Sequence, residues 1–212
     1  MKPQAIEDQS FQIIDDEAGP HQFTPAQWRI VRRMIHTSAD FDYMTSIRFH
    51  PRAIESGLSA IRSGNAVVTD TNMARAGIRT KELDHYHVRV NCLIADAVVS
   101  EIAEKSGTTR AKAAVDAAIA EMAGGIYVVG NAPTALLRLI EKIKEGRAAP
   151  ALIVGLPVGF VNAAESKDAL RELDTPFITN IGRKGGSNVA ASVVNALAIM
   201  ATQQPTTTQR ES

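Results

Sequence analysis

The 212-residue chain has little of several features that mark specialised classes of protein. Its one cysteine, Cys92, cannot form an internal disulfide or a multi-thiolate metal site, which excludes the disulfide-rich secreted and zinc-ribbon classes. No apolar run approaches the roughly 20 residues that a membrane-spanning helix needs. The first ten residues also have no apolar signal-peptide core. We therefore expect a cytoplasmic protein that has no membrane partner.

The sequence also has no excess of charge of either sign. Lys and Arg total 23 and Asp and Glu total 23, so no general basic field attracts a phosphate backbone, and nucleic-acid binding is disfavoured. No repeat or Pro/Gly-rich linker divides residues 3 to 201. We predict one domain over residues 1–201, followed by a disordered tail over 202–212, where apolar residues are almost absent.

The strongest helix signal begins at Thr24. This residue can cap a helix, Pro25 occupies the first helical position, where its missing N–H costs nothing, and Gln27 completes a capping box. The apolar stripe that follows consists of Trp28, Val31, Met34 and Ile35. An earlier helical pattern lies between residues 6 and 14. On the capped helix, Arg33 and His36 are three residues apart and therefore share a face.

From residue 50 onward, apolar strands alternate with helical segments. We expect strands at 66–70, 88–94, 126–130, 151–156 and 176–182, and helical segments at 51–63, 71–75, 95–106, 109–123, from about 131, at 163–173 and from 187 through 200. The strands are short, β-branched and apolar along their whole length, as buried parallel strands are when helices cover both faces of a sheet. The sequence predicts a three-layer α/β/α fold with a mainly parallel central sheet.

Ligands of such sheets bind beyond the carboxyl ends of the strands. The most informative of these exits is the segment 182–188, where two cations, Arg183 and Lys184, precede Gly185 and Gly186 and a helix start at Ser187. This composition suits a carboxylate or a phosphate, but a tight turn with solvated cations has the same composition. No P-loop and no strand followed by G-x-G-x-x-G is present, so neither nucleotide signature is found.

The five histidines do not form a metal-ligand pattern. His85 and His87 are the closest to one, and two such residues in a loop are more often solvated, so no metal site is predicted. His36 has two possible roles. It can exchange a proton near neutral pH beside Arg33, or it can be a helix-end histidine whose cation the helix dipole stabilises.

Six blocks of sequence resemble the precorrin-8X methylmutase family, also called precorrin isomerases. They lie in order over residues 6–198 and read Ile6-Glu7-x-x-Ser10-Phe11-x-Ile13-Ile14, Arg33-Met34-Ile35-His36-Thr37, Asp70-x-x-Met73-x-x-x-Gly77-Ile78, Gly130-Asn131-Ala132-Pro133-Thr134-Ala135-Leu136, Pro157-Val158-Gly159-Phe160-Val161 with Ala163-Ala164-Glu165-Ser166-Lys167, and Gly182-Arg183-x-Gly185-Gly186-Ser187. Ordered matches of this length are highly specific.

The resemblance implies an α/β/α isomerase of vitamin B12 biosynthesis that moves the C11 methyl group of a corrinoid ring to C12 without an added cofactor. It also implies a homodimer with a cleft near the interface, and it gives His36 the acid/base role. Substrate-binding positions implied by the resemblance are Ser10, Arg33 and Arg110. The strand exits add Asn131, Thr134, Arg183, Lys184, Gly185, Gly186 and Ser187 as candidate substrate-binding residues.

Three segments, 36–42, 69–73 and 182–191, look more like the cobalt-precorrin-8 enzymes, whose product is cobyrinate, than like their metal-free counterparts, which convert precorrin-8X to hydrogenobyrinate. The metal-free reaction is the alternative. A noncatalytic corrinoid carrier is a more remote one. A nucleotide-dependent tetrapyrrole methyltransferase is disfavoured because the turn after the strand at 66–70 contains no glycine.

Overall fold

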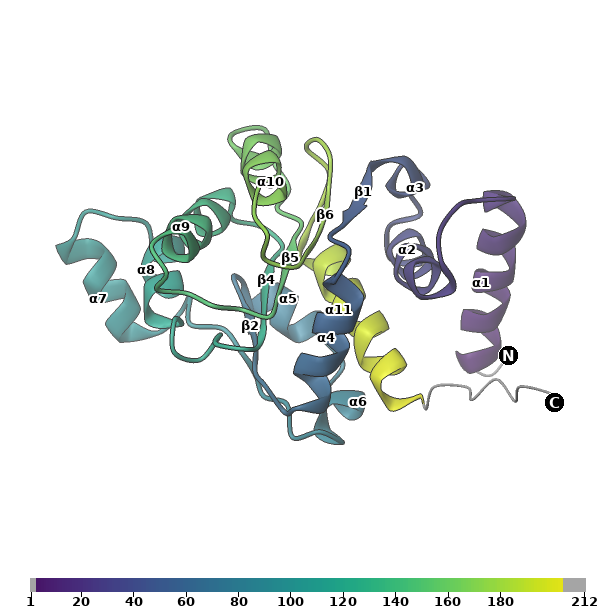
Figure 1. The fold of residues 1–212 in the computed structure, drawn as a ribbon, viewed down its shortest axis with the longest axis horizontal. Helices are drawn as coiled ribbons and strands as arrows, with labels where there is room; N and C mark the ends of the chain where they lie inside the picture. The colour runs from purple at the N-terminus through teal and green to yellow at the C-terminus, as the bar shows by residue number, and fades with distance from the viewer. Residues whose placement is uncertain (1–2, 204–212) are drawn as a thin grey trace.

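The computed structural model describes residues 3–203, which form helices around one six-stranded sheet (Figure 1). The strands are β1 (Ile47–Phe49), β2 (Val67–Thr69), β3 (Val90–Asn91), β4 (Ile126–Val129), β5 (Leu152–Gly155) and β6 (Phe177–Asn180). The helices are α1 (Pro3–Ala18), α2 (Pro25–Ser38), α3 (Tyr43–Ser46), α4 (Ala53–Arg62), α5 (Asn72–Gly77), α6 (Thr80–Asp84), α7 (Ala97–Lys105), α8 (Arg110–Ala117), α9 (Pro133–Lys144), α10 (Ala163–Arg171) and α11 (Ser187–Thr202).

The order of strands across the sheet is β1-β6-β5-β4-β2-β3. Five strands are parallel, and the edge strand β1 pairs with β6 in the antiparallel direction, with Arg48 opposite Thr179. The predicted mainly parallel sheet is confirmed. Because the parallel strands end at one edge, the loops after β2, β4, β5 and β6 lie close together there.

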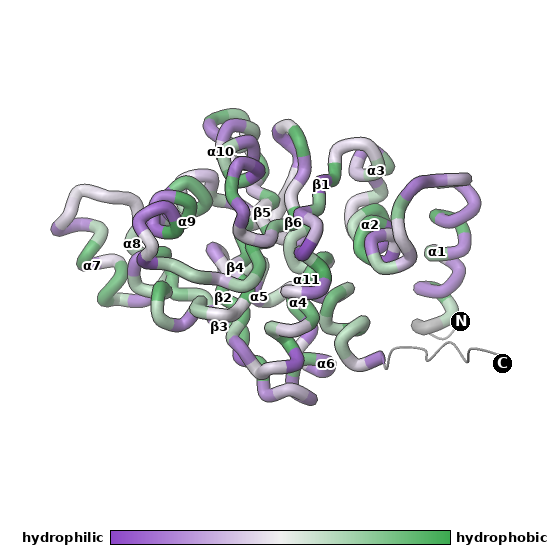
Figure 2. Tube along the Cα trace, viewed as in Figure 1, coloured by the Kyte–Doolittle hydropathy of each residue, from purple (hydrophilic) through white to green (hydrophobic). Residues whose placement is uncertain are grey.

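Residues of the strands alternate between two apolar layers. One face of the sheet packs on α2, α4 and α11 through Val67, Ile126, Val128, Leu152, Val154 and Ile178. The other face packs on α8, α9 and α10 through Val68, Tyr127, Val129, Ile153 and Phe177. Along α9 and α10, hydrophobic and hydrophilic residues alternate, as expected of helices with one buried face (Figure 2). The predicted three-layer α/β/α architecture is therefore confirmed.

The capping box predicted for α2 is present. Thr24 Oγ1 accepts a hydrogen bond from the backbone N–H of Gln27, and the Gln27 side chain accepts one from the backbone of Thr24. Arg29, near the start of α2, bonds to Gln203 just beyond the end of α11. The far end of α2, which carries His36, consequently lies toward the edge of the sheet where the parallel strands end.

Several predicted element boundaries are wrong. The strand expected at 88–94 is limited to β3, because only two of its residues pair with β2 at the edge of the sheet. The helix expected at 109–123 ends with α8, and turns follow it. The short elements β1, α3 and α6 were not predicted, since three to five residues carry too little periodicity to identify.

The tail predicted over residues 202–212 falls almost entirely outside the described residues, since Thr202 ends α11 and only Gln203 follows. Within residues 3–203, no helix combines the length and the apolar content needed to cross a bilayer.

Candidate functional site

The exits of β2 and β4 are joined by a buried carboxylate. Asp70, directly after β2, accepts backbone hydrogen bonds from Gly130, Asn131 and Ala132 at 2.7 to 2.9 Å. Burial raises the pKa of Asp70, and these three bonds act in the opposite direction. The carboxylate has no cationic partner in these contacts, so the N–H groups of the loop take the place of one. This interaction fixes the segment that precedes α9 and contains Asn131.

The start of α11 is packed against the same loop. Thr71 Oγ1 and Ser187 Oγ lie 2.9 Å apart in a hydrogen bond. A Cβ atom on Gly130 would lie 2.6 Å from Ser187 Cα, so only glycine allows this approach of the two backbones. The exits of β2, β4 and β6 thus form one rim, and the predicted residue Ser187 is buried at its centre.

Two buried polar side chains, Lys167 and Asn180, form hydrogen bonds that fix the turn between β6 and α11. Lys167 Nζ donates to Asn180 Oδ1 at 3.1 Å and to the Lys184 carbonyl at 2.7 Å. Asn180 Nδ2 donates to that carbonyl as well, at 3.0 Å. Gly185 has a φ of +159°, and a Cβ there would lie 2.2 Å from the Leu156 carbonyl, so the turn requires glycine at this position.

The two predicted cations of this turn have different environments. Lys184 Nζ is 2.6 Å from Asp40 Oδ2 and 2.6 Å from Asp42 Oδ2, in the segment that follows α2. Burial alone would raise the pKa of Asp40, but its bonds to Lys184 and to the Asp42 backbone lower it. The exposed Arg183 lies over the ring of Phe160, with Cζ 5.5 Å from the ring centroid. Lys184 therefore already has two carboxylate partners, whereas Arg183 stands at an apolar surface.

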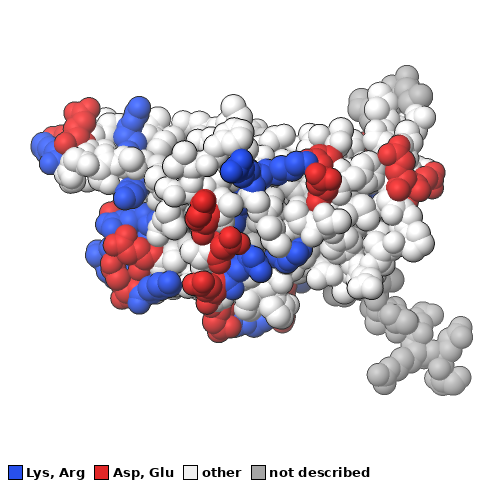
Figure 3. Space-filling model, turned by 90° about the horizontal axis from the view of Figure 1, so that it is seen from above, with Lys and Arg blue, Asp and Glu red and all other residues white. Residues whose placement is uncertain are grey.

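Charges of opposite sign are interspersed on the surface seen from above in Figure 3, so no extended face of one sign is visible there. This agrees with the zero net charge of the sequence.

His36 lies in the last turn of α2 and borders a hollow of about 360 Å³ between α1 and α2. The hollow is lined by Ser10, Ile13, Ile14, Glu17, Ile35, His36, Ala39 and Phe41. The imidazole is exposed, and its ring centroid is 5.0 Å from that of Phe11. The structure thus brings Ser10 and His36 together at one hollow from two helices, with the imidazole exposed.

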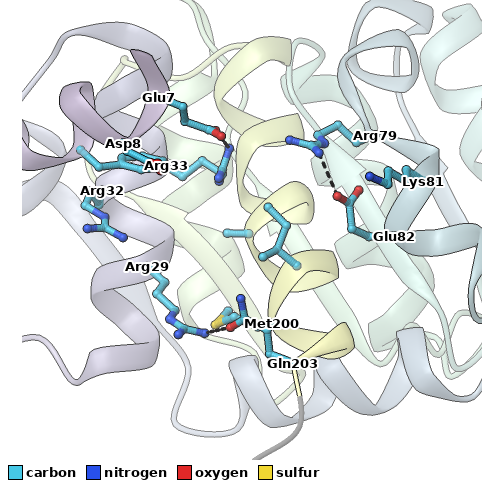
Figure 4. A pocket seen from close by; sticks show the side chains of 13 residues that line it. Glu7, Asp8, Arg29, Arg32, Arg33, Arg79, Lys81, Glu82, Met200 and Gln203 are labelled. Carbon is cyan, nitrogen blue, oxygen red and sulfur yellow. Dashed lines mark hydrogen bonds and ion pairs between the residues drawn. The ribbon is translucent and has the colours of Figure 1, made fainter. Parts of the chain in front are cut away.

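Arg33 faces a second hollow of about 440 Å³, where α1 and α2 meet α6 and α11 (Figure 4). Its Nη1 is 3.0 Å from Glu7 Oε1, and its Cζ lies 5.2 Å from the centroid of the Phe11 ring. Across the hollow, Arg79 pairs with Glu82 at 2.9 Å. Phe11 thus contacts both Arg33 and His36, and these two side chains of α2 border different hollows.

Arg110 is separated from these groups within one chain. It begins α8, which lies beyond the sheet from α1 and α2, at the opposite end of the molecule (Figure 1). Its side chain is exposed. Asn131 is exposed at the rim, and Thr134 is half-buried in the first turn of α9. Of these three residues, Arg110 thus lies across the sheet from α1 and α2.

Three residues of this region were not predicted as site residues, namely Asp70, Lys167 and Asn180. A signal for Lys167 is present in the sequence: Ala163, Ser166, Lys167 and Leu170 follow the spacing of one buried helical face. The bonds of Asp70 to a loop sixty residues away have no local signal. Among the described residues, no cluster of three or more His, Cys, Asp and Glu side chains could hold a metal ion.

The hydrogen bonds of Asp70 should contribute measurably to the free energy of unfolding. Asp70→Ala leaves three backbone N–H groups without their acceptor, and we expect the free energy of unfolding to fall by about 3 kcal/mol or more. Asp70→Asn retains one carbonyl oxygen and should lose less. Urea unfolding measures both changes, with Asp84→Ala, at an exposed carboxylate, as the control. A parent-like midpoint for Asp70→Ala would contradict this account of the rim.

Comparison with known proteins identifies the family. The precorrin-8X methylmutase family model matches residues 5–200. The cobalt-precorrin-8 methylmutase of Priestia megaterium is 51% identical to this chain, over 95% of this chain and 89% of that protein. The cobalt-precorrin-8 methylmutase of Salmonella typhimurium is 45% identical to this chain, over 93% of this chain and 95% of that protein.

A crystal structure of a precorrin-8x methyl mutase from Thermus thermophilus has a TM-score of 0.87 and 46% sequence identity, covering 93% of this chain and 96% of that one. The resemblance found in the sequence blocks is confirmed by these matches, which extend over nearly the whole described chain. The chain belongs to the precorrin-8X methylmutase family, and it is an isomerase of the cobalamin pathway.

Proposed function

We propose that this isomerase moves the C11 methyl group of cobalt-precorrin-8 to C12, giving cobyrinate, at a site formed by the His36 hollow and the rim of strand exits. One observation carries the proposal: the Lys184 ion pairs with Asp40 and Asp42 bring the segment after His36 to the rim. In this proposal an imidazole, cations and backbone N–H groups face one ligand.

The rim suits a large conjugated ring with several carboxylates. Phe160 is 84% exposed and Val161 is 77% exposed beside Arg183, so apolar surface and a cation adjoin. A corrinoid needs this combination, because its ring is apolar and its acetate and propionate groups require donors. The first turn of α11, next to Gly185 and Gly186, adds N–H groups that have no intrahelical partner.

His36 is assigned the acid/base role. A methyl shift within a conjugated ring needs no external donor. It needs greater electron demand at the carbon that receives the methyl group. Protonation of a nearby ring nitrogen, or a hydrogen bond to it, supplies that demand. Among the residues that line the hollow, His36 is the side chain suited to exchange a proton near neutral pH.

Cobalt enters this proposal as part of the substrate. The relatives from Priestia megaterium and Salmonella typhimurium are named for cobalt-precorrin-8, and the Thermus thermophilus structure for precorrin-8x. The curated precorrin-8X methylmutase of Pseudomonas aeruginosa is 39% identical to this chain, against 51% for the cobalt-precorrin-8 enzyme of Priestia megaterium, which favours the cobalt-containing ring. The metal-free ring is the alternative substrate.

The pathway assignment and the lone Cys92 favour a cytoplasmic location.

The proposal includes a homodimer, because Arg110 lies too far from His36 to share a site within one chain. Helix α7, next to α8, exposes Val98 and Ile102 by 62% and 46%. Helix α1, beside His36, exposes Ile6 and Ile13 by 53% and 49%. Contact between α7 of one chain and α1 of the other would cover both apolar surfaces and bring Arg110 to the partner's site.

The reaction itself is tested by adding cobalt-precorrin-8 to the purified protein without any methyl donor. We expect a shifted visible spectrum and a product of unchanged mass, since an intramolecular shift conserves atoms. A parallel incubation with metal-free precorrin-8X compares the two rings. A gain of one methyl group in the product, or strict dependence on an added donor, would refute the proposal. Binding without conversion would favour the carrier.

His36→Ala should lower turnover by about 10² to 10⁴, the usual contribution of general acid/base assistance, and weaken binding much less. His36→Asn keeps a donor that cannot readily be protonated near pH 7, so it separates hydrogen bonding from proton transfer. Exposed His85 offers the control, since His85→Ala should turn over like the parent. Full activity of both His36 variants would leave His36 as a helix-end histidine stabilised by the dipole.

Mixing two impaired variants, at a substrate concentration too low to saturate Arg110→Ala, tests the shared site. Arg110→Ala should bind the corrinoid about ten- to a hundredfold more weakly, as expected for loss of a charge-assisted bond. His36→Ala and Arg110→Ala, refolded together, should recover about a quarter of parental activity, because half the dimers are mixed and each has one intact site. No recovery, with mixed dimers shown to be present, would exclude Arg110 from the partner's site.

A further inference from the structure

Lys167 is a buried cation whose hydrogen-bond partners are neutral. Its relative exposure is 0%, and its ammonium donates to the Asn180 side-chain oxygen and to the Lys184 backbone carbonyl. No carboxylate accepts a bond from it among the contacts of the described residues. Burial lowers the pKa of Lys167 to about 8, and the neighbouring Asp168 on the same helix acts against this shift.

A second buried lysine, Lys142, has the carboxylate partner that Lys167 lacks. Lys142 on α9 is 4% exposed, and its ammonium is 2.6 Å from Glu145 Oε2. Buried charges are ordinarily paired in this way, because removing a charge from water costs several kcal/mol. Lys142 has its counter-ion within the chain, whereas Lys167 lies directly beneath a turn that is expected to meet a ligand.

The ionisable groups around Lys167 do not supply the missing charge. Strand β6 carries none, and Asp168 is 3.0 Å from Arg171. On α9, Arg138 bonds to Asp116 and Glu141, and Lys142 to Glu145. In the turn itself, the Lys184 ammonium is directed to Asp40 and Asp42, and the guanidinium of Arg183 lies over Phe160.

We propose that Lys167 is a positioning residue of the substrate site: it fixes the Gly182–Ser187 turn in the shape that receives a carboxylate of the corrinoid, and that carboxylate balances its charge. Since Nζ is buried, it acts through the Lys184 carbonyl and the Asn180 side chain and does not touch the substrate. This inference rests on the proposed function, because the carboxylate belongs to the proposed substrate.

Binding and protonation are then linked. An anion on the turn favours the charged form of Lys167, so the complex takes up a proton where the free protein is partly deprotonated. Affinity for the carboxylate should be highest at pH values below the pKa of Lys167 in the free protein, about 8, and should fall as the pH rises above that value. Between pH 7 and pH 9 we expect about a fivefold loss of affinity, the effect of a pKa that is about 8 in the free protein and about one unit higher in the complex.

The experiment titrates cobyrinate, the proposed product, into the full-length protein at pH 7, 8 and 9, followed by visible absorbance. Lys167→Met should bind about tenfold more weakly at pH 7, with little further change at pH 9. Lys167→Arg keeps a permanent charge and should bind equally at all three values. Lys142→Met removes the buried lysine that has a carboxylate partner, and its affinity should change with pH as the parent's does.

Proton uptake by the parent provides a measurement that needs no variant. Calorimetry at pH 8 in two buffers of different ionisation enthalpy should show about half a proton taken up per site. No uptake, or a parental slope in Lys167→Met, overturns the role of Lys167 while leaving the methyl shift intact. Failure of the parent to bind cobyrinate at pH 7 would instead overturn the proposed function, and this inference with it.

Discussion

The three bonds from the Asp70 carboxylate to the loop after β4 are the interaction on which the rim depends. They place a carboxylate where two parallel strands end, and they satisfy three backbone N–H groups of the loop that leads into α9. With this loop fixed, Gly130 can lie against Ser187, so α11 begins at the same edge. Each strand exit is thus positioned by polar contacts with its neighbour, while the apolar layers below hold the strands themselves.

Polar groups are buried in this fold mainly where the rim needs a defined shape. Asp70, Lys167, Asn180 and Ser187 are all buried and all lie at or beneath the exits of strands. The net contribution of such a group to stability is small because it loses hydration on folding, whereas its removal is costly because its partners stay buried without a bond, so each group permits few arrangements of its surroundings. Their concentration at one edge is consistent with a site that must present donors to a large ligand without changing shape.

The position of α2 connects the imidazole to this rim. Apolar residues of α2 pack against α11, while polar contacts near both ends, at Arg29 and at Asp40 and Asp42, fix its direction. His36 therefore lies near the start of α11 and away from its end. Among the predicted site residues, Arg110 begins a helix that lies across the sheet from α2.

The sequence by itself determined the layers of the fold, the capped helix that carries His36 and the family, because these depend on local periodicity, on capping residues and on ordered motifs. It also placed the Gly182–Ser187 turn at a strand exit. The bonds of Asp70 to residues sixty positions away, the two carboxylates around Lys184 and the burial of Lys167 were decided by the tertiary structure. Contacts between distant segments leave no periodic trace in the sequence. The short strand β1 went unpredicted for a related reason, since its three residues are held by pairing with β6, far along the chain.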